Sequence, residues 1–342
     1  MISGRTCSTV TPDGSLTNLT FTGSGVPARS ERPSHNFSVM PRGTVRSADG
    51  ASIEIAYETL GDPGGIPLLM VHGLGMQLVG WHPELLRELT ARGYYLAIFD
   101  NRDAGESTHF AHAGSPDIMK LLARDASGAA YTLAELADDA AGLLDLLDWP
   151  TAHVFGVSMG GMIVQTLALR YPERLRSLTT IMATTGADGV GQPTDAALGT
   201  LLSPPAGSRD DYIENSVRNY SIIGSTDFPH DYDHVRTRAG QSWDRGYDPE
   251  GTIRQVAAIL ASGDRTALLG DLRLPTLVVH GTADPLVDVS GGRATAAAIR
   301  GAELLEVEGM GHDLPREVWP RLLDRLDDVV ARGENGFRAT AA

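Results

Sequence analysis

The order of the apolar segments limits the fold of this chain more than any other feature. Short, continuous apolar runs, often closed by glycine, alternate with segments whose apolar residues recur at helical spacing. Strands buried on both faces have such continuous runs, and they occur in parallel sheets covered by helices. The alternation predicts an α/β fold: a mostly parallel sheet with helices on both faces. The predicted strands cover residues 51–62, which alternate apolar and polar residues, and 66–73, 94–100, 152–158, 177–186, 274–284 and 302–309.

Helices are predicted between these strands. Thr132 and Glu135 have the spacing of a capping box, and the residues that follow place apolar side chains at helical intervals. Gly93 follows an earlier amphipathic segment and marks its end. A long polar connection is expected over residues 101–131. The predicted helices cover residues 82–93, 133–147, 159–176, 291–301 and 315–333.

One segment interrupts the alternation and divides the chain. Residues 187–270 contain helical stretches without a strong strand, so we predict a helical cap inserted into an α/β core of residues 41–186 and 271–335. The cap is expected over the carboxyl edge of the sheet, where open α/β sheets bind ligands. Residues 1–40, of which 20 are Ser, Thr, Gly or Pro, are expected to be a disordered tail, with Met40 as an alternative start. A flexible end is expected over residues 336–342.

Charge and composition exclude several classes of partner. The formal net charge is −15 and no basic block is present, which argues against nucleic-acid binding. There is neither an apolar run of about 18 residues nor a signal-peptide pattern, so we expect a cytoplasmic protein without a transmembrane segment. Cys7 is the only cysteine, which excludes an intrachain disulfide and a Cys-based zinc site. We expect no metal and no cofactor, and a monomer or homodimer.

A serine between two glycines is the first candidate for chemistry. Gly156, Ser158 and Gly160 form a G-x-S-x-G motif, which is weak evidence by itself. Here, however, the motif lies where a predicted buried strand ends and a predicted helix begins. Such a sharp turn raises the serine above the sheet edge, and only very small residues fit two positions before and after it. This context predicts that Ser158 is a nucleophile.

A serine nucleophile needs a base, and the base needs an acid that orients it. In an elbow enzyme these partners follow in the order Ser, Asp or Glu, His. Asp284 directly follows one predicted strand, and His312 lies in a glycine-flanked loop after the next. We therefore predict that Asp284 and His312 complete the site. Asp288 and Asp188 remain alternative acids.

Two backbone N–H groups are predicted to stabilise the charge that develops on a substrate carbonyl oxygen. One belongs to Met159, at the N-terminus of a predicted helix, where the helix dipole favours negative charge. The other belongs to Leu74, whose glycine neighbours Gly73 and Gly75 let the loop approach a substrate closely.

Five motifs, taken together, resemble the α/β-hydrolase family over about residues 43–333. They are "HGLG", "FDNRDAGES", "GVSMGGMI", "GTADPLVD" and "GMGHDLP", in the order and near the spacing of that family. The second and third are most similar to the branch of aclacinomycin methylesterase and bacterial lipase/esterase proteins. The resemblance implies ester hydrolysis through an acyl-serine intermediate, without a cofactor. The chain departs from the family in having HGLG rather than HGGG, and Asp103 where many members have glycine.

The expected function is a serine carboxylic-ester hydrolase for a small to medium, largely apolar ester. Alternatives on the same three residues are methyl-ester or lactone hydrolysis, perhydrolysis, acyl transfer and C–C bond hydrolysis. A ligand-binding protein of low turnover is the alternative from another class. Residues with other expected roles are His72, His153 and His280 (packing or loop), Asp100 and Arg102 (bracing a loop), Asp313 (solvated), and Trp81, His82 and Met159 (pocket wall).

Overall fold

The computed structural model describes residues 8–10, 16–18, 41–46, 50, 52–201 and 203–341. The chain forms two compact units, Met1–Val39 and Met40–Ala342. In the first, β1 (Ser8–Val10) pairs antiparallel with β2 (Leu16–Asn18). The rest of the segment that we expected to be disordered lies outside the described residues, as does Met40.

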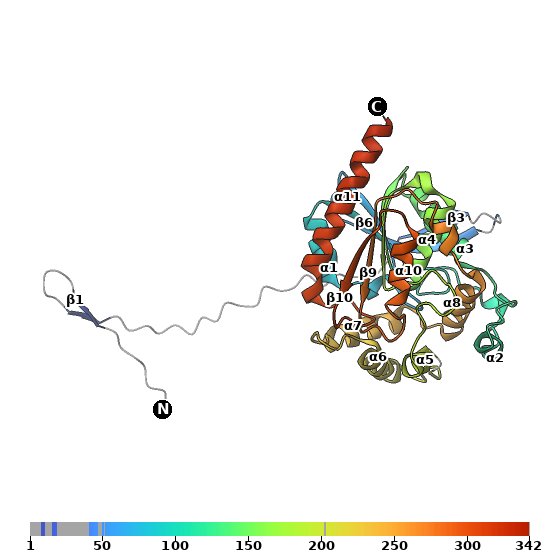
Figure 1. Ribbon diagram of the computed structural model, residues 1–342. Coiled ribbons are helices and arrows are strands. Elements are labelled where there is room, and N and C mark those ends of the chain that lie inside the picture. The colour runs from blue at the N-terminus through green and yellow to red at the C-terminus, as the bar shows by residue number, and fades with distance from the viewer. Residues whose placement is uncertain are drawn as a thin grey trace. The chain divides into compact units, whose positions relative to one another are not determined.

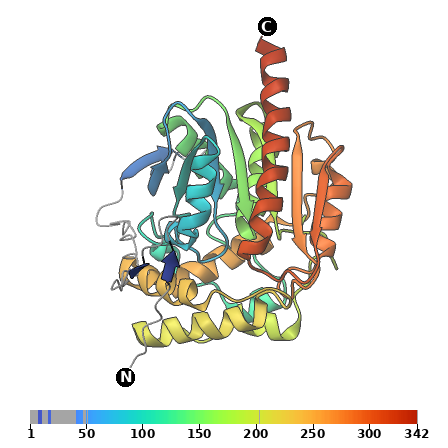
Figure 2. The ribbon, with the colours of Figure 1, turned by 90° about the vertical axis from the view of Figure 1, so that its left-hand side faces the viewer.

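The second unit is built on an eight-stranded sheet with the order β10-β9-β8-β7-β5-β6-β4-β3 (Figures 1 and 2). Strands β10 through β6 in this order pair in parallel, whereas β4 and β3 are antiparallel to their neighbours. The mostly parallel α/β fold predicted from the sequence is thereby confirmed. The strands are β3 (Arg42–Arg46), β4 (Ser52–Leu60), β5 (Ile66–Val71), β6 (Tyr94–Phe99), β7 (Ala152–Val157), β8 (Leu175–Ile181), β9 (Thr276–Gly281) and β10 (Glu303–Val307).

Strand β3 has no counterpart among the strands predicted from the sequence. It is a short edge strand in which only Val45 is buried, so its sequence lacks the continuous apolar run of the central strands. Those runs are present where both faces are covered, and every described residue of β9 is buried. The pattern used for prediction therefore detects burial on two faces, and a short edge strand escapes it.

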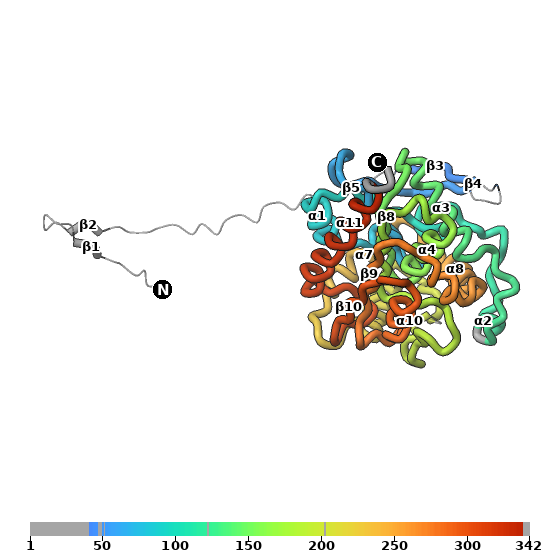
Figure 3. Tube along the Cα trace, turned by 45° about the horizontal axis from the view of Figure 1, so that its top comes forward, coloured from blue at the N-terminus to red at the C-terminus, as the bar shows by residue number. Residues whose placement is uncertain are grey.

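Helices cover both faces of the sheet (Figure 1). On one face α1 (Pro83–Ala91) and α11 (Trp319–Ala341) are joined by ion pairs of Arg92. On the other, α3 (Leu133–Leu146) packs beside α4 (Met159–Arg170), and α10 (Ser290–Ala298) lies against β9 and β10 (Figure 3). The capping box of Thr132 and Glu135 at the start of α3 is confirmed. No helix within the described ranges combines the length and apolar character that a bilayer crossing requires.

Between β8 and β9 the described residues form helices and no strand. Figure 2 shows the main helices of this segment as a layer across one end of the sheet. We call this segment the cap; its status as a separate domain stays a prediction. Its helices are α5 (Asp195–Leu201), α6 (Arg209–Ile223), α7 (Tyr232–Arg245), α8 (Pro249–Ser262) and α9 (Thr266–Leu269).

Buried ion pairs join the cap to the loop that follows β6. Arg254 of α8 donates two hydrogen bonds to the Asp103 carboxylate, at 2.9 and 2.8 Å, and each residue is only 1 % exposed. Asp103 has a φ of 65°, so it adopts the backbone conformation that glycine takes without strain. In the same loop, Asp100 pairs with Arg245 of α7 and Arg102 pairs with Asp139. The expected bracing role of Asp100 and Arg102 is confirmed.

The Asp103–Arg254 pair yields a stability prediction. Arg254→Met should lower the free energy of unfolding by about 3–5 kcal/mol, because it leaves the Asp103 carboxylate buried without its partner. The measurement is urea denaturation followed by circular dichroism. Arg209→Met, which breaks the exposed pair with Asp244, should cost far less. Equal losses in the two variants would contradict the prediction.

Candidate active site

Ser158 lies at a strained turn between β7 and α4. Its φ is 58° and its ψ is −122°, values that a residue with a Cβ rarely adopts. Its N–H donates to the Ile181 carbonyl at 2.9 Å, which holds the turn against β8. A Cβ on Gly156 would collide with the Gly160 carbonyl, and a Cβ on Gly160 would collide with the Val71 carbonyl. The glycines are therefore required by the close approach of helix and strand.

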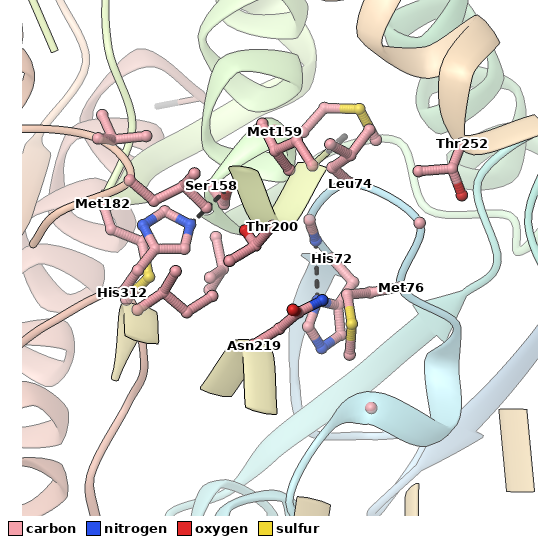
Figure 4. A pocket seen from close by; sticks show the side chains of 18 of the residues that line it. His72, Leu74, Met76, Ser158, Met159, Met182, Thr200, Asn219, Thr252 and His312 are labelled. Atoms are coloured by element: carbon pink, nitrogen blue, oxygen red, sulfur yellow. Dashed lines mark hydrogen bonds between the residues drawn. The ribbon is translucent and has the colours of Figure 1, made fainter. Parts of the chain in front are cut away.

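A continuous chain of hydrogen bonds joins Ser158, His312 and Asp284. Ser158 Oγ lies 2.9 Å from His312 Nε2 (Figure 4). On the other side of the ring, His312 Nδ1 lies 2.7 Å from Asp284 Oδ2. Asp284 follows β9 and His312 follows β10, as the sequence order required. The arrangement is satisfied when Nδ1–H donates to the carboxylate and Nε2 accepts from the serine hydroxyl.

The environment of Asp284 keeps its carboxylate ionised. Its other oxygen accepts the backbone N–H groups of Leu286 and Val287, both at 2.9 Å. Burial opposes ionisation, but the electrostatic attraction of His312 and the hydrogen bonds of His280 and His312 outweigh it, so the pKa of Asp284 lies well below its usual range. His280 Nε2 is 3.5 Å from this carboxylate.

The two alternative acids do not reach His312. Asp288 is exposed and accepts the N–H of Ser290 at 2.9 Å. The Asp188 side chain is 98 % exposed and pairs with Arg124. Of the three aspartates weighed from the sequence, the structure brings only Asp284 to the histidine.

The loop after β5 runs directly beside Ser158. A Cβ on Gly73 would lie 3.1 Å from the Ser158 Cβ. Within this loop the Gly73 N–H donates to His72 Nδ1, and the Gly75 N–H donates to Gln255 Oε1 of α8, both at 2.8 Å. The backbone N–H groups of Leu74 and Met159, by contrast, have no acceptor among the described residues.

A large cavity opens over Ser158. Its volume is about 1590 Å³, and its walls come from the loop after β5, from α4 and from the cap helices α5 to α8. Trp81, His82 and Met159, which we expected in the pocket, all line it. Figure 4 shows the side chains of Met76, Met159 and Met182 among the residues that line the cavity.

The three histidines expected to have packing or loop roles each have a hydrogen-bond partner within the protein. His153 is buried and lies 2.7 Å from Ser177 Oγ, which confirms its packing role. Burial, and then the charge of Arg238, lowers the pKa of His72 to about 3. His72 and His280 nevertheless contact residues of the site. The sequence gives only a positional signal for these contacts. His280 lies four residues before Asp284, and His72 lies beside Gly73 in the loop after β5.

The structure corrects the expectation that Asp313 is solvated. Its carboxylate accepts hydrogen bonds from the Tyr220 hydroxyl at 2.9 Å and from the N–H and Oγ–H of Ser225. Asp313 therefore ties the end of α6 to the loop that carries His312. Whether Asp313 is solvated or hydrogen-bonded depends on its partners Tyr220 and Ser225, and the sequence does not reveal these contacts.

Among the residues that the structure describes, one group of side chains has metal-ligand geometry. Asp103, His109 and Asp248 bring ligand atoms within 4.8 Å of one another. Arg254, however, donates hydrogen bonds to both carboxylates. Its guanidinium already supplies the positive charge that a metal ion would bring.

The chain matches the model of the α/β hydrolase fold family over residues 66–315. It belongs to that family, and it is a hydrolase. It is 31% identical to rhodomycin D methylesterase DnrP of Streptomyces peucetius over 299 residues, which cover 80% of this chain and 94% of that protein.

Proteins less similar to this chain are consistent with its membership of the α/β hydrolase fold family. The chain is 26% identical to a 2-hydroxy-6-oxononadienedioate/2-hydroxy-6-oxononatrienedioate hydrolase of Paraburkholderia xenovorans, covering 78% of this chain and 87% of the relative. The structure of esterase RhEst1 from Rhodococcus sp. superposes with a TM-score of 0.64 at 22% identity, covering 85% of this chain and 99% of that one. The latter likeness shows the fold.

His72 yields a prediction about acid stability. Its pKa is about 3 when folded, against an ordinary value of 6.5. Between these pH values the unfolded chain binds a proton that the folded protein excludes, so this site makes stability fall as pH falls below about 6.5. His72→Gln should flatten the decline between pH 6 and pH 4 by up to about 1.4 kcal/mol per pH unit. Urea denaturation at several pH values measures it, and parallel curves for the two proteins would refute it.

Proposed function

We propose that this protein is a serine carboxylic-ester hydrolase that cleaves the methyl ester of a bulky, largely apolar acid. The observation that carries the proposal is the hydrogen-bonded chain of Ser158, His312 and Asp284, which opens into the large cavity. The 31% identity to a methylesterase supports the choice of ester.

In the first half of the proposed reaction, Ser158 becomes acylated. His312 Nε2 takes the hydroxyl proton while Oγ forms a bond to the ester carbonyl carbon, whose oxygen becomes an oxyanion. The N–H groups of Leu74 and Met159, which have no acceptor in the described protein, donate to that oxygen. The C–O bond to the alcohol then breaks, and the leaving methoxide takes the proton from His312.

In the second half, water replaces the alcohol. His312 removes a proton from the water, the resulting oxygen attacks the acyl carbon, and the acid leaves when Ser158 Oγ recovers the proton. Asp284 stays ionised throughout, because its environment lowers its pKa. It holds the His312 ring in the required tautomer and stabilises the charged imidazolium.

The cavity favours a larger substrate than the small to medium ester expected from the sequence. Its volume of about 1590 Å³ exceeds the roughly 300–1,000 Å³ common for small-molecule sites. Cap helix α8 contributes Ile253, Val256 and Ile259 to its wall, and these apolar side chains suit an apolar ring system.

The function is tested first at the serine. Wild-type protein should hydrolyse p-nitrophenyl esters and methyl esters of polycyclic acids, and Ser158→Ala should lower kcat by about 10⁴-fold or more. A fluorophosphonate probe should label the wild type once and leave the variant unlabelled, as intact-mass spectrometry would show. Equal activity of both proteins would remove Ser158 from the mechanism. Cleavage of a C–C bond, with no ester turnover, would replace the proposed reaction.

A second test separates the two aspartates near the histidine loop. Asp284→Asn should lower kcat by about 10⁴-fold, because asparagine cannot stabilise the imidazolium and favours the wrong tautomer. The matched control is Asp288→Asn, which changes an exposed carboxylate and should keep kcat close to that of the wild type. Similar losses in both variants would argue against Asp284 as the orienting acid.

A further inference from the structure

Arg238 presents a positive charge to the cavity without an acidic partner. It lies on α7 in the cap, and its half-buried side chain lines the same cavity as Ser158. The hydrogen bond that it forms joins Nη1 to the Met76 sulfur at 3.6 Å, and a thioether is a weak acceptor. Among the described residues no carboxylate oxygen lies within ion-pair distance of its guanidinium.

Two arginines near the site have buried side chains, and each of them pairs with an aspartate. Arg245, on the same helix, pairs with Asp100, and Arg254 pairs with Asp103. The chain has a net charge of −15 and therefore an excess of carboxylates, yet none of the described carboxylates forms an ion pair with Arg238. Removing part of a guanidinium from water without a charged partner is unfavourable, so an acceptor supplied by a ligand would stabilise it.

The groups around Arg238 leave its charge available. Asp313 acts on it electrostatically, but that carboxylate already accepts hydrogen bonds from Tyr220 and Ser225. The facing histidines are neutral, since burial, and then Arg238 itself, lowers the pKa of both His72 and His234 to about 3. Tyr212 and Tyr220 also face the guanidinium and are uncharged at neutral pH, because burial raises the pKa of each.

The position of Arg238 connects it to the reacting groups. Its partner Met76 belongs to the loop after β5, and the N–H of Met76 donates to the Gly73 carbonyl at 3.2 Å. Gly73 in turn lies against Ser158. The guanidinium therefore lies against the same loop that carries the Leu74 N–H and touches Ser158.

The wall next to Arg238 is polar, in contrast to that of α8. Helix α6 lines the cavity with Tyr212, Asn215, Ser216 and Asn219, spaced so that they share one face of the helix. Figure 4 shows the Asn219 side chain among the residues that line the cavity. The cavity thus has one apolar wall and one wall of hydrogen-bonding groups with a guanidinium beside it.

We propose that Arg238 binds a carboxylate of the substrate, so that the preferred ester carries a second, free acid group. The inference deepens the proposed ester hydrolysis and rests on it for the identity of the reacting bond. A guanidinium matches a carboxylate through two parallel hydrogen bonds, which makes Arg238 a specificity-determining residue.

The test compares acidic and neutral esters of the same shape. Monomethyl esters of dicarboxylic acids, from succinate to naphthalene-2,6-dicarboxylate, are assayed beside the matching esters in which the free acid is a primary amide. For the best-fitting member the wild type should show kcat/KM higher for the acid by about 10–100-fold. Arg238→Met should lower that ratio at least tenfold, and Arg238→Lys should keep part of it.

The control is Arg236→Met on the same helix, which removes an exposed pair with Glu214 outside the cavity and should keep the wild-type ratio. Thermal melting verifies that each variant is folded. No preference for any acid in the wild type, or an unchanged ratio in Arg238→Met, would overturn the proposal.

A binding measurement separates this proposal from the proposed reaction. Calorimetry with Ser158→Ala needs no turnover, and it compares naphthalene-2,6-dicarboxylate with 6-carbamoyl-2-naphthoate. Tighter binding of the dicarboxylate, lost when Arg238→Met is added, supports the carboxylate site even where ester hydrolysis fails. Equal binding of the two ligands refutes it even where esters are cleaved.

Discussion

The close approach of α4 to the central strands is the constraint on which the site depends. Ser158 is held in a strained turn because its N–H bonds to β8 and because Gly156 and Gly160 allow the helix to touch the strands. The strain is tolerated only where the surrounding packing enforces it. The same packing leaves the first N–H of α4 without an intrahelical acceptor. One local geometry therefore exposes the hydroxyl and supplies a donor beside it.

The cap is part of the site as well as its cover. The His312 N–H donates to the Ile223 carbonyl at the end of α6, at 2.7 Å, and Asp313 binds Tyr220 and Ser225. Gln255 of α8 likewise holds the Gly75 N–H. The position of the histidine and the shape of the loop after β5 therefore depend on cap helices, and the cap cannot shift at these points without moving the groups around Ser158.

The sequence predicted the parts of the molecule that depend on burial on both faces or on chain order. Continuous apolar runs identified the central strands, and the order of Ser158, Asp284 and His312 placed these residues at one edge of the sheet. The edge strand β3 was missed because only Val45 is buried there. Asp313 was misinterpreted because its partners, Tyr220 and Ser225, lie about ninety positions away in the cap, and helix pairing there leaves no periodic signal that links the two segments.

Contacts between distant segments leave no signal in the sequence, and for the same reason the motifs did not predict the substrate. The residues around Ser158 determine a type of reaction, whereas the walls of the cavity come from helices whose packing the sequence does not reveal. In the structure, Arg245 and Arg254 join the cap to the loop after β6, and their charges are used within the protein. Arg238 lies two turns before Arg245 on α7, forms no ion pair with a carboxylate of the described residues, and lines the cavity. Whether a carboxylate of the protein meets a cap arginine therefore decides if the residue positions the cap or, as we propose for Arg238, binds the ligand.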